Sequence, residues 1–166
     1  YAPLVAPRLT CEQTTRTDTE ANVCVIRPAT IRLPGLARII SMVTFFIELM
    51  RITKTMRPDV IVNYAISTGL CALTIAKLKN IPFVLHVIDA LHTLVPYRWL
   101  RPLAYWMETI LLRNSNATIY INQKLQEYGL KHGANPSSAY TVSTGVDLDF
   151  FRSTKYGNSY LFKKHE

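Results

Sequence analysis

Asp89 and His92 have the types and the spacing of residues that take part in chemistry. Both follow residues 83–87, an apolar run typical of a buried strand. At the end of such a strand a carboxylate can accept a hydrogen bond from a substrate hydroxyl, and a histidine three residues later can donate or accept a proton near neutral pH. Asp89 can equally cap the turn after the strand. The sequence leaves both interpretations of Asp89 open.

His86 and a polar segment upstream are further candidates for substrate contact. Alternation along the strand places His86 on the opposite face from Asp89, and a hydrogen-bonded histidine in the core is the favoured interpretation of His86. Residues 63–69 form a predicted polar turn after an earlier apolar run. In a parallel sheet this turn lies at the same edge as Asp89. Its candidate residues are Asn63, Ser67 and Gly69.

A third group, Thr144, Gly145 and Asp147, follows a predicted strand over residues 139–142. Gly145 permits a positive φ angle or a close approach of backbone. Asp147 can cap the turn that comes next. The spacing alone is found in many loops and indicates no particular chemistry.

The chain has no sequence pattern for a phosphate-binding loop or a metal site. Its six glycines form neither GxGxxG nor GxxxxGKS, which disfavours a dehydrogenase or a P-loop NTPase. Its four histidines have no HxxxH or HExxH spacing. The three cysteines form no CxxC pair, which favours a reducing compartment. We therefore expect no metal site and no cofactor bound by this domain.

The elements that must position these residues alternate between apolar strands and helices. Such alternation is typical of parallel βαβ units and predicts an α/β, doubly wound, mostly parallel Rossmann-like sheet. In such a sheet, ligands meet the loops at the carboxyl ends of the strands. The predicted strands span residues 2–6, 23–26, 60–62, 83–87, 117–121 and 139–142, and the predicted helices include residues 36–56, 70–78 and 123–132.

Four segments, taken in order, resemble the N-terminal domain of family 4 glycosyltransferases, which have the GT-B fold. Residues 57–61 (RPDVI) resemble the family's KPDVI, and residues 80–84 (NIPFV) followed by Asp89 resemble its iP-x-V strand with an HD or RDLW loop. Residues 117–122 (ATIYIN) resemble AD-x-VI-x-vS, and residues 145–151 (GVDLDFF) resemble NGVD-x-x-x-F. Each piece is weak alone, but together they are specific.

The resemblance implies one half of an enzyme that transfers a sugar, usually with retention, from a nucleotide-sugar donor to a glycan or lipid-linked acceptor. Members of the family synthesise polysaccharides and glycolipids. This half would bind the acceptor, and Asp89 matches the catalytic loop position. Thr144, Gly145 and Asp147 match a hinge-side loop, although the family usually has Asn where this chain has Thr144. The candidate acceptor contacts are His86, His92, Asn63, Ser67 and Gly69.

The resemblance also implies domain boundaries. Residues 1–150 would be the N-terminal domain, and residues 151–166 would begin an interdomain linker. The family's first strand with its Gly-Gly loop, and its C-terminal donor-binding domain with an E-x7-E motif, have no counterpart in this sequence. We therefore expect a chain that is incomplete at both ends and inactive alone. Its stability would be marginal unless residues 2–6 occupy the position of the first strand.

The formal net charge of +8 indicates an acidic partner. Residues 27–113 hold eleven basic and four acidic side chains, and therefore most of the excess. The helix over residues 36–56 is favoured as an ordinary sheet-covering helix. The mixture of aromatic and cationic residues over 97–106 suits the headgroup boundary of a membrane, and packing within the protein explains it equally well. The membrane-surface candidates are Arg98, Trp99, Arg101 and Trp106.

Two functions from different classes are consistent with these sequence features. The first is a catalytic glycosyltransferase that works with a C-terminal donor-binding domain. The alternative is a non-catalytic acceptor and membrane-docking subunit of a split two-chain glycosyltransferase. Either function predicts a cytoplasmic protein, with peripheral attachment to the inner face of an anionic membrane as a further expectation. Nucleic acid is a less favoured partner than a sugar acceptor or a membrane, because the predicted fold and loops resemble those of a glycosyltransferase.

Overall fold

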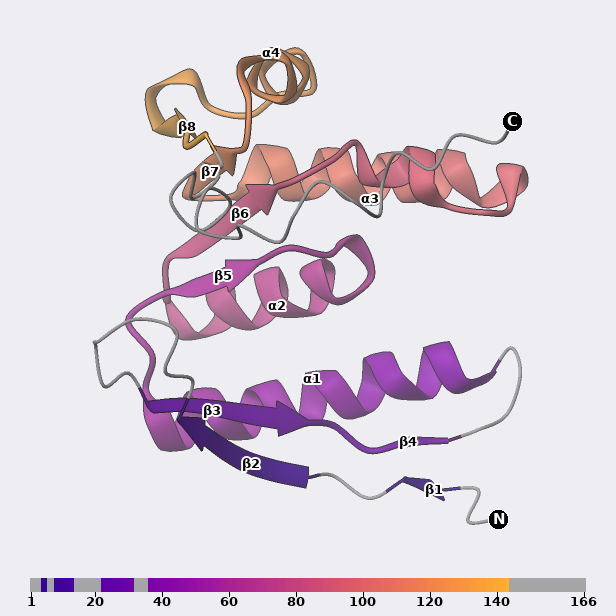
Figure 1. The fold of residues 1–166 in the computed structure, drawn as a ribbon, viewed down its shortest axis with the longest axis vertical. Coiled ribbons are helices and arrows are strands. Elements are labelled where there is room, and N and C mark those ends of the chain that lie inside the picture. Colours follow the sequence, from indigo (N-terminus) through magenta and orange to yellow (C-terminus); the bar gives the residue numbers. More distant parts are fainter. Residues whose placement is uncertain (1–3, 6–7, 14–21, 32–35, 144–166) are drawn as a thin grey trace, which may run out of the picture.

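A computed structural model describes residues 4–5, 8–13, 22–31 and 36–143 (Figure 1). From residue 61 onward its strands and helices alternate as the sequence predicts. The hinge-side candidates Thr144, Gly145 and Asp147 lie outside the described residues, as does the predicted linker over residues 151–166.

A four-stranded parallel sheet forms the centre of the structure. Its strand order is β5–β6–β7–β8, so each strand lies beside the next strand along the chain, and a helix connects each pair. This is the connectivity of a Rossmann-like α/β fold and confirms the predicted fold class. The elements are β5 (Ile61–Asn63), α2 (Ile66–Lys79), β6 (Phe83–Val87), η1 (Leu91–Leu94), η2 (Arg98–Leu100), α3 (Arg101–Asn114), β7 (Ala117–Tyr120), α4 (Gln123–Lys131), η3 (Pro136–Ser138) and β8 (Ala139–Thr141).

The hydrophobic core lies between this sheet and helices α2 and α3. Alternate residues of β6, from Phe83 to Val87, are buried, while His86 between them is half-buried on the other face. The buried residues form one cluster with Leu73 of α2 and Leu111 of α3. Burying a leucine side chain contributes about 2 kcal/mol. This packing holds β6 in place and so fixes the loop at its carboxyl end.

The N-terminal strands do not join the parallel sheet. The predicted strand over residues 23–26 is present, but it pairs antiparallel with the strand before it. A local antiparallel pair closes a shorter loop than a crossover into a distant sheet. Leu4 and Val5 also pair outside the sheet, so they do not occupy the position of a first strand beside β5. The pairs are β1 (Leu4–Val5) with β4 (Thr30–Ile31), and β2 (Arg8–Gln13) with β3 (Asn22–Arg27).

Helix α1 (Leu36–Met56) has the bounds that the sequence predicts, but not the expected position. It packs mainly against α2 and β4 rather than on the four-stranded sheet, so the expectation that it covers the sheet is wrong. Leu49 reaches the edge of the core, and Thr53 is buried with its hydroxyl donating to the Leu49 carbonyl at 2.9 Å. Helix α2 packs against β5 and β6, and α1 lies beside α2, on the side of β3 and β4 (Figure 1). Neither α1 nor any other described helix combines the length and the apolarity that a membrane span requires.

Candidate functional site

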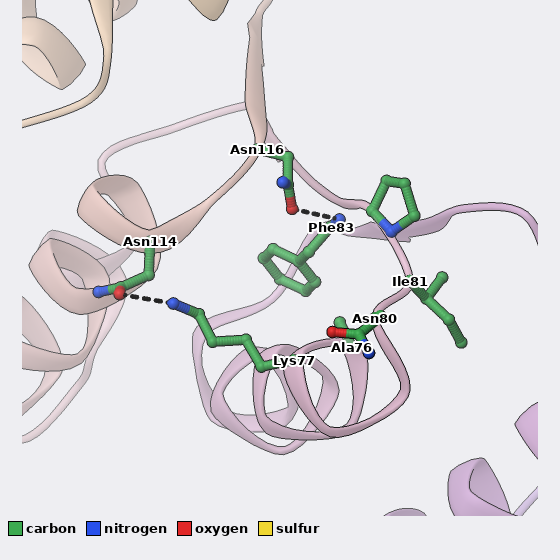
Figure 2. Close-up of a pocket in the computed structure, with 8 residues that line it drawn as sticks. Ala76, Lys77, Asn80, Ile81, Phe83, Asn114 and Asn116 are labelled. Atoms are coloured by element: carbon green, nitrogen blue, oxygen red, sulfur yellow. Dashed lines mark hydrogen bonds between the residues drawn. The ribbon is translucent and has the colours of Figure 1, made fainter.

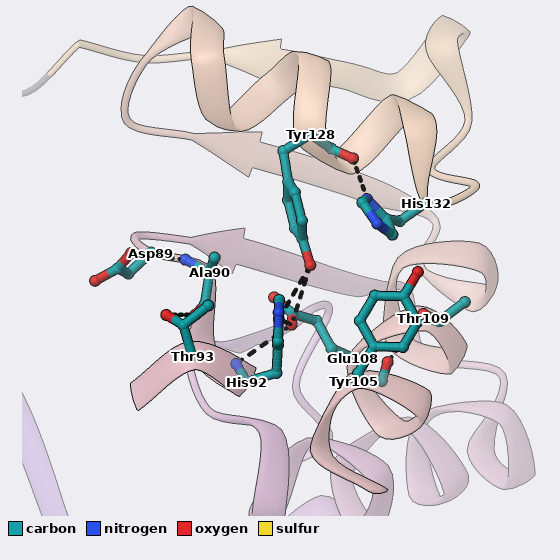
Figure 3. A network of polar contacts seen from close by, with 9 residues as sticks. All are labelled: Asp89, Ala90, His92, Thr93, Tyr105, Glu108, Thr109, Tyr128 and His132. Atoms are coloured by element: carbon teal, nitrogen blue, oxygen red, sulfur yellow. Dashed lines mark hydrogen bonds and ion pairs between the residues drawn. The ribbon is translucent and has the colours of Figure 1, made fainter. Parts of the chain in front are cut away.

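The carboxyl ends of β5, β6 and β7 bring three loops to one edge of the sheet. Parallel pairing places Asn63 beside Leu85 and Val87 beside Tyr120, so the strands end at similar heights. The loop after β6 carries Asp89 and then η1, and it lies beside α3 and α4 (Figure 3). Ligands bind at this edge in open α/β sheets. The candidates Asp89 and His92 therefore lie where the fold predicts a site.

Asp89 lies directly before the turn that leads into η1. One carboxylate oxygen, Oδ1, accepts a hydrogen bond from the backbone N–H of Ala90 at 2.7 Å. The N-cap position of η1 is nevertheless Ala90, and no side chain caps it, so the structure does not bear out the capping interpretation of Asp89. The Asp89 side chain is exposed at the sheet edge and points away from the His92 ring in Figure 3. A substrate hydroxyl can therefore reach the carboxylate while its hydrogen bond to Ala90 is in place.

His92 is held by a carboxylate from the next helix along the chain. Its ring atom Nδ1 lies 2.7 Å from Oε2 of Glu108, and its backbone N–H donates to the same oxygen at 3.4 Å. Glu108 is only 3% exposed. We assign a proton to Nδ1, because an ionised Glu108 carboxylate accepts hydrogen bonds and cannot donate one. A neutral His92 then has its lone pair on Nε2, the atom that Glu108 does not occupy.

Tyr128 of α4 is the third member of this polar cluster, with His92 and Glu108. Its hydroxyl donates to Oε2 of Glu108 at 3.3 Å and lies 3.2 Å from Nδ1 of His92. Burial, together with the nearby negative charge of Glu108, raises the pKa of Tyr128 well above its usual value. The phenol therefore stays protonated near neutral pH and remains a hydrogen-bond donor to the carboxylate.

Aromatic contacts fix the orientation of this cluster. Tyr105 of α3 meets the rings of His92 and His132 edge-on, each at a centroid distance of 5.3 Å. The His132 ring lies 4.1 Å from that of Tyr128, and its Nδ1 is 2.6 Å from the Tyr128 carbonyl oxygen. The cluster joins η1, α3 and α4 at one end of the sheet (Figure 3). Packed rings of this kind restrict the rotamers that His92 can adopt.

Helix α4 places Tyr128 through a cap that the sequence predicts. The side chain of Asn122 accepts a hydrogen bond from the backbone N–H of Leu125 at 2.9 Å, which fixes the start of the helix directly after β7. Gly133, with φ +98°, follows the end of the helix, as the sequence predicts. The ends of α4, and so the place of Tyr128 within the helix, are therefore fixed by local signals.

The candidates Asn63, Ser67 and Gly69 do not lie in a loop. Asn63 is the last residue of β5, and the other two are in helix α2. Helix α2 begins at Ile66, so Ser67 and Gly69 lie in its first turn, and the predicted turn over residues 63–69 is wrong. Gly69 is buried, and a Cβ atom there would lie 2.7 Å from Cδ1 of Leu111. The glycine thus permits close packing of α2 on α3. The amide of Asn63, which is buried, donates to the Ala65 carbonyl at 2.7 Å.

His86 lies away from His92, on the other face of β6. Its ring meets that of Tyr64 at a centroid distance of 4.8 Å and is half-buried. It is therefore neither a fully buried core histidine nor a member of the Glu108 cluster.

Glu108 and Tyr128 were not among the residues that the sequence singles out. A signal for Glu108 exists: it is the one acidic residue in residues 90–126, and it shares a helical face with Ala104, Leu111 and Leu112. An acid on an apolar helix face implies a buried polar partner, because burying it alone is costly. The second carboxylate oxygen, Oε1, is buried and has no hydrogen-bond partner among the described residues.

A separate hollow of about 470 Å³ opens at the opposite edge of the sheet, at the amino ends of β6 and β7 (Figure 2). Two of its polar contacts are made within the protein. Lys77 donates to Oδ1 of Asn114 at 2.9 Å, and the Phe83 backbone N–H donates to Oδ1 of Asn116 at 2.9 Å. The hollow lies at the opposite edge of the sheet from the Asp89 loop.

Within the part of the chain that the structure describes, no three metal-ligating side chains are grouped.

Comparison with known proteins agrees with the geometry of the fold. A comparison with curated protein sequences gave no significant match. The family model of Glycosyltransferase Family 4 matches residues 5–150, most of the chain. This match agrees with the parallel sheet and with the motifs on its strands. The chain therefore belongs to glycosyltransferase family 4 and carries the family's N-terminal domain.

Proposed function

We propose that the chain binds the acceptor of a glycosyl transfer at the carboxyl edge of its sheet, with Asp89 and His92 in contact with acceptor hydroxyls. The sugar would come from a nucleotide-sugar donor, with retention, and the acceptor would be a glycan or a lipid-linked sugar. A C-terminal domain would bind the donor. In this proposal the chain alone binds acceptor but transfers no sugar.

The observation that carries the proposal is the 2.7 Å contact between His92 and Glu108, in the same loop region as Asp89, whose side chain is exposed. A buried carboxylate that fixes one ring nitrogen leaves the other, Nε2, as a hydrogen-bonding atom of known orientation. Family membership supports glycosyl transfer at the general level. The position of the loop at the carboxyl ends of parallel strands supports its role in binding.

The two residues would act differently on an acceptor hydroxyl. The carboxylate of Asp89 accepts a hydrogen bond from a hydroxyl and so raises the negative charge on that oxygen, which favours its attack on a sugar carbon. Nε2 of His92 accepts from a second hydroxyl, or donates to it when the ring is protonated. Two fixed contacts of this kind would orient one sugar ring against the sheet edge.

Replacing Asp89 with asparagine or His92 with glutamine is expected to weaken sugar binding about tenfold each, since the first replaces a charged acceptor with a neutral one and the second replaces the ring nitrogen that Glu108 orients with a flexible amide. The measurement is titration of the ¹⁵N-labelled chain with methyl glucoside, methyl galactoside and methyl mannoside, followed by amide chemical shifts. We expect the shifts from at least one glycoside to gather on residues 88–95.

Asp59→Asn is the matched control, because Asp59 is an exposed acid before β5, at the opposite edge of the sheet. It should leave binding unchanged. Glycoside shifts that gather around Lys77 and Asn116 instead, or shifts on residues 88–95 that Asp89→Asn and His92→Gln both leave intact, would overturn the proposal. Absence of any shift with all three glycosides would also count against it.

A further inference from the structure

The start of helix α3 exposes large aromatic side chains to solvent. Trp99 is 76% exposed, Trp106 is 57% exposed, and Leu103 between them is 53% exposed. Tyr97 is also exposed, and its ring lies 6.5 Å from that of Trp99. We call Tyr97, Trp99, Leu103 and Trp106, with the exposed Arg98 and Arg101, the aromatic surface.

The aromatic surface comprises the segment just before α3 and the outward face of the first turns of α3, and it is not a poorly packed part of the core. The face that packs into the protein carries Ala104, Glu108 and Leu111, which are all buried. With 3.6 residues per turn, Trp106 points nearly opposite to this buried face, and Leu103 points to the side of it. Burying two tryptophans would release several kcal/mol, so a partner that covers them gains much of its binding energy there.

The charge of the segment favours one class of partner. Residues 90–107 hold no Asp or Glu, while Arg98 and Arg101 are exposed among the aromatic side chains. Arg101 donates a hydrogen bond from Nε to the Val95 carbonyl at 3.2 Å, which holds the guanidinium near the start of α3. Tryptophan and tyrosine rings favour the interface between headgroups and acyl chains, and arginine binds anionic headgroups.

The position of the surface is consistent with this partner. The segment that begins α3 projects beyond the ends of the strands, on the side of the carboxyl edge (Figure 1). A projecting helix end can enter a planar bilayer surface without a clash from the sheet. The same side carries η1 and therefore the Asp89 loop.

We propose that the aromatic surface anchors the protein to bilayers that contain anionic lipid, with Trp99 and Trp106 at the level of the headgroups. This goes beyond the proposed acceptor binding. Vesicle binding requires no sugar, so the two proposals can fail separately.

Intrinsic fluorescence tests the proposal directly, because Trp99 and Trp106 are the chain's two tryptophans. Adding vesicles of phosphatidylcholine with phosphatidylglycerol should shift the emission to shorter wavelength and sediment the protein. Vesicles of phosphatidylcholine alone should bind much more weakly. Arg98→Gln with Arg101→Gln should weaken binding to anionic vesicles by roughly tenfold to thirtyfold. Trp99→Ser should weaken it as well and keeps Trp106 as the reporter.

Lys124→Gln with Lys131→Gln is the matched control, since it removes the same charge from exposed positions on α4. Its effect should be clearly smaller. Equal loss in the two double variants, equal binding to both kinds of vesicle, or absence of binding would overturn the proposal. A shift of the emission that grows with protein concentration in the absence of lipid would also overturn it, in favour of a second copy of the chain as the partner.

Discussion

Replacement of Glu108 with alanine is expected to lower the free energy of unfolding by about 3 kcal/mol, because it removes one member of a buried polar cluster and leaves the others without a partner. Glu108 is buried and accepts from both His92 and Tyr128. Without it, the Tyr128 hydroxyl and the His92 N–H lose their acceptor, and the lost methylene groups leave a cavity.

Denaturant unfolding followed by circular dichroism measures this loss. Glu108→Gln should cost less, about 1 kcal/mol, since the amide keeps the volume and one acceptor oxygen. Glu127→Ala is the matched control, because Glu127 is an exposed glutamate on α4. Its effect should be within about 0.5 kcal/mol of zero. If Glu108→Ala unfolds at the same denaturant concentration as the control, the cluster does not stabilise the fold as described.

Replacement of Gly129 with alanine is expected to lower the free energy of unfolding by about 2–3 kcal/mol, although alanine favours helix by about 1 kcal/mol over glycine. A Cβ atom at this position would overlap the Tyr120 hydroxyl oxygen and lie 2.5 Å from Cζ of the same ring. Tyr120 is fully buried at the end of β7, so its ring cannot move away without disturbing the core.

Gly69→Ala is the comparison for this prediction. There the nearest atoms to a new Cβ are the ends of the Leu111 and Asn63 side chains, which can shift more easily than a buried ring. We expect a smaller loss at Gly69 than at Gly129. Tyr120→Phe should recover part of the loss in the Gly129→Ala background, because it removes the overlapping oxygen. A Gly129→Ala chain at least as stable as the wild type would contradict the observed packing of α4 on β7.

The parallel sheet was predictable from the sequence because its signals are local. The apolar runs that became β6 and β7 have Pro82 and Asn116 directly before them, and Asn122 caps the helix that follows β7. The predicted start of α2, at residue 70, is wrong because a local signal there misleads: the helix begins at Ile66. Residues 67–69 (Ser-Thr-Gly) resemble a turn locally, but Gly69 is placed for contact with Leu111, which only the folded structure reveals.

The pairing of the N-terminal strands and most of the site could not be predicted in this way. Which strand pairs with which is decided by competition between distant segments, and the sequence pattern of residues 23–26 is the same for either partner. Glu108 and Tyr128 lie 16 and 36 residues from His92 in the chain. Their convergence depends on how α3 and α4 pack, so spacing alone could identify His92 but not the groups that hold it.

The most direct test of the Glu108–His92 pair at the centre of the proposed acceptor site is the tautomer of the His92 ring. Two-bond ¹H–¹⁵N correlation spectra identify which ring nitrogen carries the proton. In the wild type we predict a proton on Nδ1, with an Nε2 resonance that moves when a binding methyl glycoside is added. In Glu108→Gln, the preference for the proton on Nδ1 should weaken. A ring protonated on Nε2 alone in the wild type, with no response to glycoside, would contradict the pair and its role in acceptor binding.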